Sequence, residues 1–161
     1  MYQHKEAHDG VGGRVYYEVE GTDARGNVTG ARYHDGSYQS VWGYDDDDGQ
    51  LNRISTDNGS VQELNFQYDE IGNLQWRHDG TGSRDFGEDF VYDDLNRLGD
   101  ATISLAGSEQ SSQQVTYDDS GNILSKSDVG TYTYGYQAGD GSCGNAGPHA
   151  VCRVATDGGI S

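Results

Sequence analysis

Apolar side chains recur at every second position over several short stretches of the chain. Leu64, Phe66 and Tyr68 are separated by polar residues, and residues 15–19 and 132–136 alternate in the same way. Successive side chains of a β-strand point to opposite faces of its sheet, so this alternation predicts strands with one buried and one solvated face. No apolar stripe with helical spacing extends beyond one turn. We therefore expect an all-β protein with negligible helix.

Five copies of one phrase follow each other along the chain. In its full form, Tyr-Asp is followed by two variable residues and then by Gly or Asn, beginning at Tyr68, Tyr92 and Tyr117. A looser copy at residues 22–28 lacks the Tyr, and the copy at residues 44–51 has one extra residue. The Gly or Asn positions recur at steps of 23, 23, 24 and 25 residues, and they are Gly26, Gly49, Gly72, Asn96 and Gly121. This period indicates a repeat architecture.

The repeated residues have the properties of a turn between two strands. An Asp side chain can accept a hydrogen bond from the backbone two residues later, and Gly or Asn tolerates a positive φ. The Tyr ends the incoming strand, and we expect it to be largely buried and stacked on its counterpart in the next repeat. Because Asp69, Asp93 and Asp118 occupy the same place in each repeat, we interpret them as turn formers rather than catalytic carboxylates. The positions to which we assign a structural role are Tyr44, Asp45, Gly49, Tyr68, Asp69, Gly72, Tyr92, Asp93, Asn96, Tyr117, Asp118 and Gly121.

A second, weaker turn signal lies between the copies, so each repeat of about 24 residues holds two turns and two strands. One such hairpin cannot bury its apolar face alone, and its stability must come from stacked neighbours. The sequence therefore predicts antiparallel β-hairpin repeats in a continuous curved or spiralling sheet. This array spans residues 14–161 and follows an N-terminal segment or truncated repeat at residues 1–13; its turns lie at residues 23–28, 45–51, 69–74, 93–98 and 118–123.

These residues resemble the YD repeat of the RHS/YD-repeat family, whose motif reads roughly Tyr-Asp-x-x-Gly-Asn-Leu. The similarity covers residues 14–157, and residues 121–135 and 147–151 are similar to repeats near the end of RHS cores in bacterial polymorphic toxins. In that family, which includes toxin-complex cocoons and the teneurins, the repeats form a sheet that spirals into a hollow shell. The resemblance therefore implies an arc of an RHS-type β-shell.

The resemblance also implies a function. It implies a non-catalytic scaffold, secreted or at the cell surface, that forms part of a wall enclosing or presenting a toxin or an extracellular surface. Its partners would be further YD repeats of the same or a larger chain. YD repeats are also described as carbohydrate-binding, so a glycan-binding module is the alternative. The family's self-cleavage box, Asp-Pro-x-Gly-Leu, has no counterpart, because the only proline is Pro148.

The charge balance argues against two classes of partner. With 27 acidic and 10 basic residues, the formal net charge is −17. Nucleic acids and anionic lipids are bound by basic surfaces, so we expect neither as a partner. No stretch approaches the roughly 20 apolar residues of a membrane span, and no apolar signal-peptide region follows Met1. Leu, Ile, Val and Phe together make up only about 16 % of the residues, which is typical of disordered chains, but 12 Tyr and 2 Trp can bury large areas.

Two further groups of side chains could carry chemistry. An acidic run could bind Ca²⁺ through oxygen ligands, but we prefer a solvated acidic turn and expect no cofactor; the run is Asp45, Asp46, Asp47 and Asp48. Trp42 and Trp76 could stack on sugar rings, together with Tyr16 and Tyr38, if they face solvent in a row. The sequence contains no nucleophile elbow, phosphate loop or zinc-protease motif, and we therefore expect no enzyme.

The chain has two cysteines, Cys143 and Cys152, which lie nine positions apart. They could form one disulfide in an oxidising compartment or remain two thiols inside a cell. If the protein is exported, we predict a disulfide that closes the loop around Pro148. Two cysteines are too few for a four-ligand zinc site, and we expect no metal centre.

Overall fold

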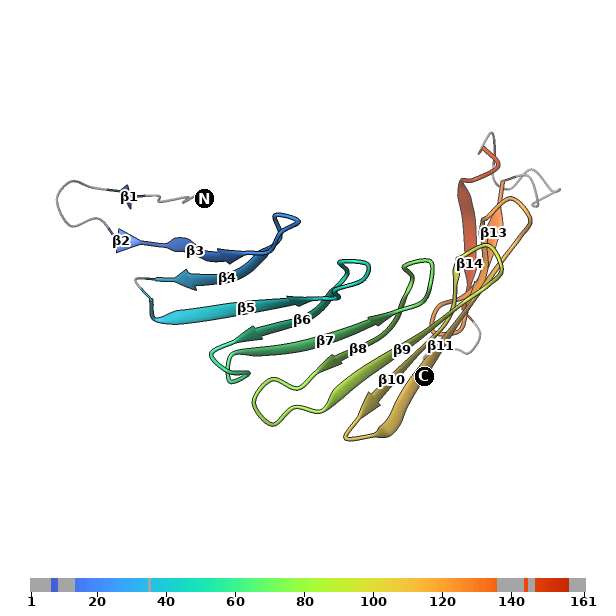
Figure 1. Cartoon of the computed structure of the whole chain (residues 1–161). Helices are drawn as coiled ribbons and strands as arrows, with labels where there is room; N and C mark the ends of the chain where they lie inside the picture. Colours follow the sequence, from blue (N-terminus) through green and yellow to red (C-terminus); the bar gives the residue numbers. More distant parts are fainter. Residues whose placement is uncertain (1–6, 9–13, 35, 136–143, 145–146, 157–161) are drawn as a thin grey trace. The chain divides into compact units, whose positions relative to one another are not determined.

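The computed structural model describes residues 7–8, 14–34, 36–135, 144 and 147–156. These residues form strands and turns and contain no helix. Strands β3 to β14 form one sheet of 12 strands whose order follows the sequence, whereas β1 and β2 pair with each other (Figure 1). Neighbouring strands pair antiparallel. The expected all-β chain of antiparallel hairpins is therefore confirmed.

Most strands are five to eight residues long. Their bounds are β1 Ala7–His8, β2 Arg14–Val15, β3 Tyr17–Thr22, β4 Val28–Tyr33, β5 Tyr38–Tyr44, β6 Leu51–Thr56, β7 Gln62–Tyr68, β8 Leu74–Asp79, β9 Phe86–Tyr92, β10 Leu98–Leu105, β11 Ser108–Tyr117, β12 Ile123–Lys126, β13 Gly130–Tyr134 and β14 Val151–Ala155. Among the residues that the structure describes, no helix is long and apolar enough to cross a membrane.

The repeated phrase forms alternate connections along the sheet. It joins β3 to β4, β5 to β6, β7 to β8, β9 to β10 and β11 to β12. The connections at the other strand ends are more varied. The sequence pattern does not predict the turn between β10 and β11, where Ala106 has a φ of 49° and Gly107 a φ of 70°. An L-residue with positive φ is uncommon, and Ala106 carries no turn signature that would mark it.

The chain divides into two compact units. Unit 1 comprises the described residues of Met1–Asp89 and Ser104–Ser108, and unit 2 those of Phe90–Ile103 and Glu109–Ser161. Unit 1 contains β3 to β8 and the start of β9. Unit 2 contains most of β10 and β11 together with β12, β13 and β14.

The strand register separates the side chains of unit 1 onto two faces. Directly opposed residues share a face, as do Trp42, Ile54 and Leu64 on β5, β6 and β7. We call this side the apolar face; its members include Val19, Tyr33, Trp42, Ile54, Leu64 and Phe66. The opposite side, the polar face, carries ion pairs such as Arg53 with Glu63. The predicted alternation therefore produces one apolar and one polar face over most of unit 1. On β8 the register instead places Arg77 and Asp79 opposite Phe66 and Leu64, on the apolar face.

Burial is lower than the sequence pattern predicts. Among the described residues, the buried hydrophobic side chains are Ala31, Val115 and Tyr134. Trp42, Leu64 and Phe66 on the apolar face are only half-buried. The expectation of a buried face is therefore wrong for unit 1 as described, because its strands form a single layer. A sheet becomes buried only when a second layer packs on it.

Candidate functional site

Each repeated turn is organised around the carboxylate of its Asp. In the third turn, Asp69 Oδ1 accepts hydrogen bonds from the backbone amides of Ile71 at 3.0 Å and Asn73 at 2.8 Å. Asp69 Oδ2 accepts a further bond from the side-chain amide of Asn73 at 2.9 Å. The turns of Asp23 and Asp118 repeat this pattern. These carboxylates are therefore used inside their own turns.

The Gly or Asn of each phrase has the backbone conformation that the turn requires. The φ angles are 92° at Gly72, 85° at Gly121 and 59° at Asn96. Glycine reaches this left-handed region without a steric penalty, and Asn is among the best substitutes. At this position the amide bonds back to the carbonyl of the Asp, at 3.1 Å between Gly72 and Asp69.

The residue after this Gly has a role that the sequence reasoning missed. The side-chain amides of Asn27, Asn73 and Asn122 each donate to the Asp of their own turn at 2.9–3.0 Å. Asn fits because it can reach back four residues while its own backbone amide bonds to the same carboxylate. Its recurrence directly after Gly26, Gly72 and Gly121 is the signal that could have revealed this role.

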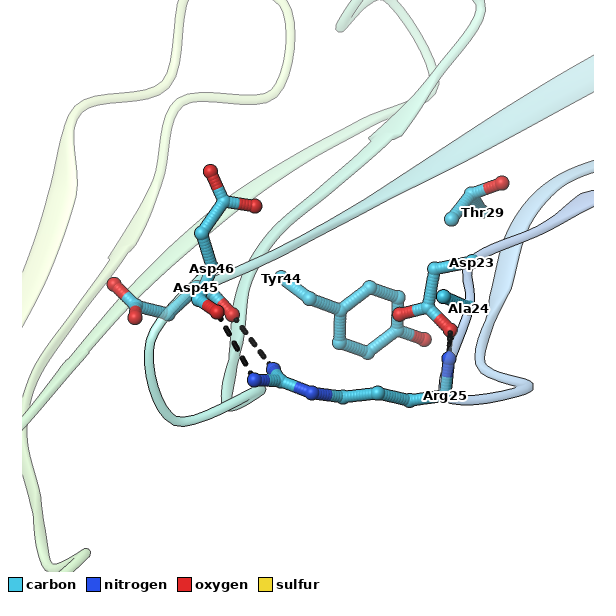
Figure 2. A pocket seen from close by; sticks show the side chains of 7 residues that line it. All are labelled: Asp23, Ala24, Arg25, Thr29, Tyr44, Asp45 and Asp46. Atoms are coloured by element: carbon cyan, nitrogen blue, oxygen red, sulfur yellow. Dashed lines mark hydrogen bonds between the residues drawn. The ribbon is translucent and has the colours of Figure 1, made fainter.

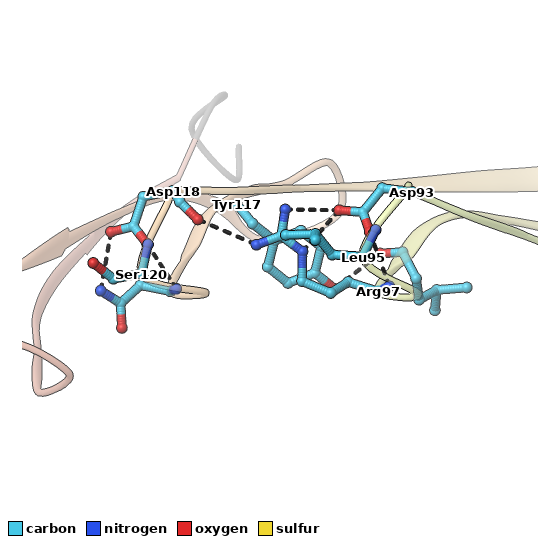
Figure 3. Close-up of polar contacts among 8 residues, drawn as sticks. Asp93, Leu95, Arg97, Tyr117, Asp118 and Ser120 are labelled. Carbon is cyan, nitrogen blue, oxygen red and sulfur yellow. Dashed lines mark hydrogen bonds and ion pairs between the residues drawn. The ribbon is translucent and has the colours of Figure 1, made fainter.

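The fourth turn replaces this Asn with Arg97, which connects two turns (Figure 3). Its Nε donates to Asp93 Oδ2 at 2.7 Å, and Nη1 donates to the carbonyl of Asp118 at 3.2 Å. The guanidinium carbon also lies 4.5 Å from the centre of the Tyr117 ring. Arg97 thus completes its own turn and bonds to the next turn along the sheet.

The acidic run forms the second repeated turn, which is one residue longer than the others. Two Asp side chains here share the amide hydrogen bonds that a single Asp accepts in the other turns. Asp45 Oδ1 accepts from the Asp47 amide at 2.8 Å, and Asp48 Oδ1 accepts from the Gln50 amide at 2.8 Å. Arg25 reaches this turn from the preceding one and donates to the carbonyls of Asp45 at 3.2 Å and Asp46 at 2.9 Å (Figure 2). It also donates to the carbonyl of Asp47 at 3.0 Å. A cleft of about 350 Å³ lies beside this contact. The Arg25 guanidinium therefore joins the first repeated turn to three backbone carbonyls of the second.

The tyrosines at the strand ends connect neighbouring hairpins through their hydroxyl groups. Tyr44 donates to the carbonyl of Val28 at 3.1 Å, and Tyr117 donates to that of Leu98 at 2.9 Å. Tyr134, which is not part of a repeated Tyr-Asp phrase, donates in the same way to the carbonyl of Ile123 at 3.0 Å. Each acceptor is the first residue of the strand that leaves the preceding repeated turn; these residues are Val28, Leu98 and Ile123.

A register irregularity occurs at the tyrosines. The pairing shifts at Gly43/Tyr44, Gln67/Tyr68, Thr116/Tyr117 and Thr133/Tyr134. A β-bulge re-aims the side chain beside it, and this allows the ring to turn towards the neighbouring strand. Tyr68, Tyr92 and Tyr117 are half-buried. Each of these rings is therefore shielded over part of its surface and exposed over the rest.

Hydrogen bonds lower the pKa of several carboxyl groups in the turns. The Thr81 hydroxyl and amide, together with Arg84, lower the pKa of Asp79 to about 2. Partial desolvation would raise the pKa of Asp69, but the hydrogen bonds of its turn outweigh this effect and keep the pKa below its usual value. The pKa of Asp93 is lowered first by the backbone hydrogen bond from the residue four positions later. These turns are therefore built for ionised carboxylates.

The two tryptophans do not lie in one row. Trp42 lies on the apolar face opposite Ile54, whereas Trp76 lies opposite Gln67 on the polar face. Both are half-buried. Trp76 stacks on His78, with ring centres 5.5 Å apart and planes 2° from parallel. A single glycan platform that uses both tryptophans is therefore ruled out by the register.

The last repeated turn is joined to the segment that follows β13. Asn122 donates to the carbonyl of Pro148 at 3.3 Å, and its Oδ1 lies 2.7 Å from Nδ1 of His149. Cys152, on β14, is disulfide-bonded. Cys143 lies outside the described residues, so the Cys143–Cys152 pair stays a prediction.

Comparison with known proteins adds no assignment. No protein-family model matches the chain, and no curated protein matches its sequence. The described residues also contain no group of three or more His, Cys, Asp or Glu side chains placed to hold a metal ion. The repeated contacts are therefore the features from which a function can be inferred.

Proposed function

We propose that the chain is a non-catalytic β-scaffold of the RHS/YD-repeat type. It would be secreted or at the cell surface and would form a segment of a shell wall that encloses or presents a toxin or an extracellular surface. The observation that carries the proposal is the repeated use of one set of contacts. The carboxylates of Asp69, Asp93 and Asp118, which could otherwise resemble catalytic groups, each accept hydrogen bonds from their own turn.

Further YD repeats are the partners that this scaffold would take. The 12-stranded sheet has β3 and β14 as its two edge strands. An edge strand presents backbone N–H and C=O groups that another strand can pair with. Additional repeats of the same or a larger chain would therefore extend the sheet without changing the contacts inside each turn.

A carbohydrate-binding module is the second candidate. The parallel stack of Trp76 on His78 supports it, because a flat aromatic surface on the polar face could accept a sugar ring. Tyr16 and Tyr38 are also available, with exposed fractions of 53 % and 45 %. These rings could contribute to separate contacts, since Tyr38 shares the apolar face with Tyr33.

A glycan array probed with the full chain separates the two functions. The scaffold proposal expects no glycan to bind at micromolar concentration. The alternative expects binding that Trp76→Ala abolishes while the melting temperature stays within a few degrees, and that Trp42→Ala, on the opposite face, leaves intact. That second pattern would replace the scaffold proposal with the carbohydrate-binding one.

A further inference from the structure

The apolar face of unit 1 has no covering layer within the described residues of that unit. Its side chains come from β3 to β8 and the start of β9. Three small residues on it, Ala31, Ser40 and Thr56, are buried, and the others are half-buried or exposed. Tyr38 on this face is 45 % exposed. A sheet face whose apolar side chains keep part of their surface in water is a candidate interaction surface.

The composition of this face is that of a protein interface. Aromatic rings from Tyr33, Trp42 and Phe66 lie on it. A groove of about 310 Å³ on this face is lined by three apolar and three charged side chains, which are Leu64, Phe66, Phe86, Arg77, Asp79 and Glu88. The charged side chains at the groove are held in ion pairs, Arg77 with Glu88 and Asp79 with Arg84. Interface centres are likewise enriched in aromatic residues and depleted in unpaired charge.

The apolar face of unit 1 is large enough for a specific interface. Seven strands at about 4.8 Å spacing and six residues at about 3.3 Å give a flat face of roughly 34 Å by 20 Å, or about 670 Å². Two such faces in contact would bury about 1,300 Å², which lies within the range of stable specific interfaces.

We infer that a second copy of this chain packs on the apolar face of unit 1, face to face, as a two-layer β-sandwich. The contact is isologous, because both copies use the same face. This face is close to electrically neutral, since its charged side chains form ion pairs. The net charge of −17 therefore lies outside the contact, where it weakens association through repulsion that salt can screen. Aligned sheets pack about 10 Å apart in this way and interdigitate their inward side chains.

The two tryptophans provide a reporter for each face. In the full chain, Trp76→Phe leaves Trp42 as the only tryptophan, on the apolar face, and Trp42→Phe leaves Trp76 on the polar face. We expect sedimentation equilibrium to show a mass that rises from 17.5 kDa to twice that value with increasing concentration. Over the same range, Trp42 should become protected from acrylamide quenching and Trp76 should not. Added sodium chloride should shift the transition to lower concentration.

A matched pair of substitutions tests the face directly. Phe66→Lys places a charge on the apolar face, and Gln67→Lys places the same charge on the adjacent, opposite-facing position. Phe66→Lys should raise the dimer dissociation constant at least about tenfold, whereas Gln67→Lys should leave it close to that of the unsubstituted protein. A chain that stays monomeric up to high micromolar concentration would overturn the inference. So would self-association that protects Trp76 rather than Trp42; this second measurement remains decisive if Phe66→Lys does not fold.

Discussion

Replacing Tyr117 with Phe tests whether the tyrosine hydroxyls hold neighbouring hairpins together. The Tyr117 hydroxyl donates to the carbonyl of Leu98 at 2.9 Å, and the ring lies 4.5 Å from the guanidinium carbon of Arg97. Phe keeps the ring, its volume and the contact with the cation. The substitution therefore removes only the hydrogen bond and leaves the Leu98 carbonyl without this donor.

The expected loss follows from the environment of the bond. An intramolecular hydrogen bond contributes about 0.5–1.5 kcal/mol net, because water competes for both partners. Tyr117 and Leu98 are half-buried, so water can only partly replace the lost donor. We expect Tyr117→Phe to lower the free energy of unfolding by about 1 kcal/mol. Tyr44→Phe, which removes the equivalent 3.1 Å bond to Val28 in unit 1, should cost a similar amount.

Urea unfolding of the full chain, followed by circular dichroism, measures this loss. The matched control is Tyr16→Phe, because Tyr16 is 53 % exposed and surface substitutions usually change stability by less than about 0.5 kcal/mol. The denaturant slope should be the same for all variants, since the surface exposed on unfolding does not change. If Tyr117→Phe were as neutral as Tyr16→Phe, the Tyr117 hydroxyl would not stabilise the contact between repeats.

Tyr117→Leu extends the test to the ring. This change also removes the contact with Arg97 and should cost at least about 0.5–1 kcal/mol more than Tyr117→Phe. In the background of Arg97→Met, the additional cost should shrink by that amount, because the cation is already absent. A double-mutant cycle with no coupling between the two positions would contradict the cation–π contact.

The remaining predictions concern the turns and the disulfide. Gly72→Ala should destabilise by about 1 kcal/mol because its φ is 92°, whereas Gly30→Ala, in a strand, should be nearly neutral; equal thermal shifts would refute the turn argument. Asp79 has a lowered pKa in the folded protein, so its ionised form stabilises the fold above the unfolded pKa of about 4. This stabilisation is lost as the pH falls towards 2, and a melting temperature that stays constant from pH 5 to 2 would contradict it. Arg25→Ala should speed amide hydrogen exchange in the second repeated turn only, and unchanged rates there would show that the carbonyl contacts do not hold it. The thiol of Cys152 should react with a maleimide only after reduction, and labelling of native protein would show that it is free.

The local chemistry of the repeats could be predicted from the sequence. Alternation of apolar and polar residues identifies strands because side chains of a strand point to alternate faces. The turn positions follow from residues whose backbone or side-chain preferences act over at most four positions, as with Asp69 and Gly72. The antiparallel order of the hairpins also follows, since short connections join strands that are neighbours in the sheet.

Contacts between repeats could not be predicted in the same way. Tyr117 bonds to a residue 19 positions away, and Arg25 bonds to carbonyls 20–22 positions away. Which atoms meet over such separations depends on strand register, and each bulge at a repeated tyrosine changes the side on which later residues point. This is why the sequence could not show that Trp42 and Trp76 lie on opposite faces.

By itself, the sequence determined that the chain is β, where it turns and which side chains build each turn, because these properties depend on near neighbours in the chain. Only the tertiary structure decided what fraction of each apolar side chain's surface is buried. In unit 1 the strands form one layer, so Trp42, Leu64 and Phe66 share a face that remains half-buried. Burial depends on what packs over a face, and no pattern along a single strand contains that information.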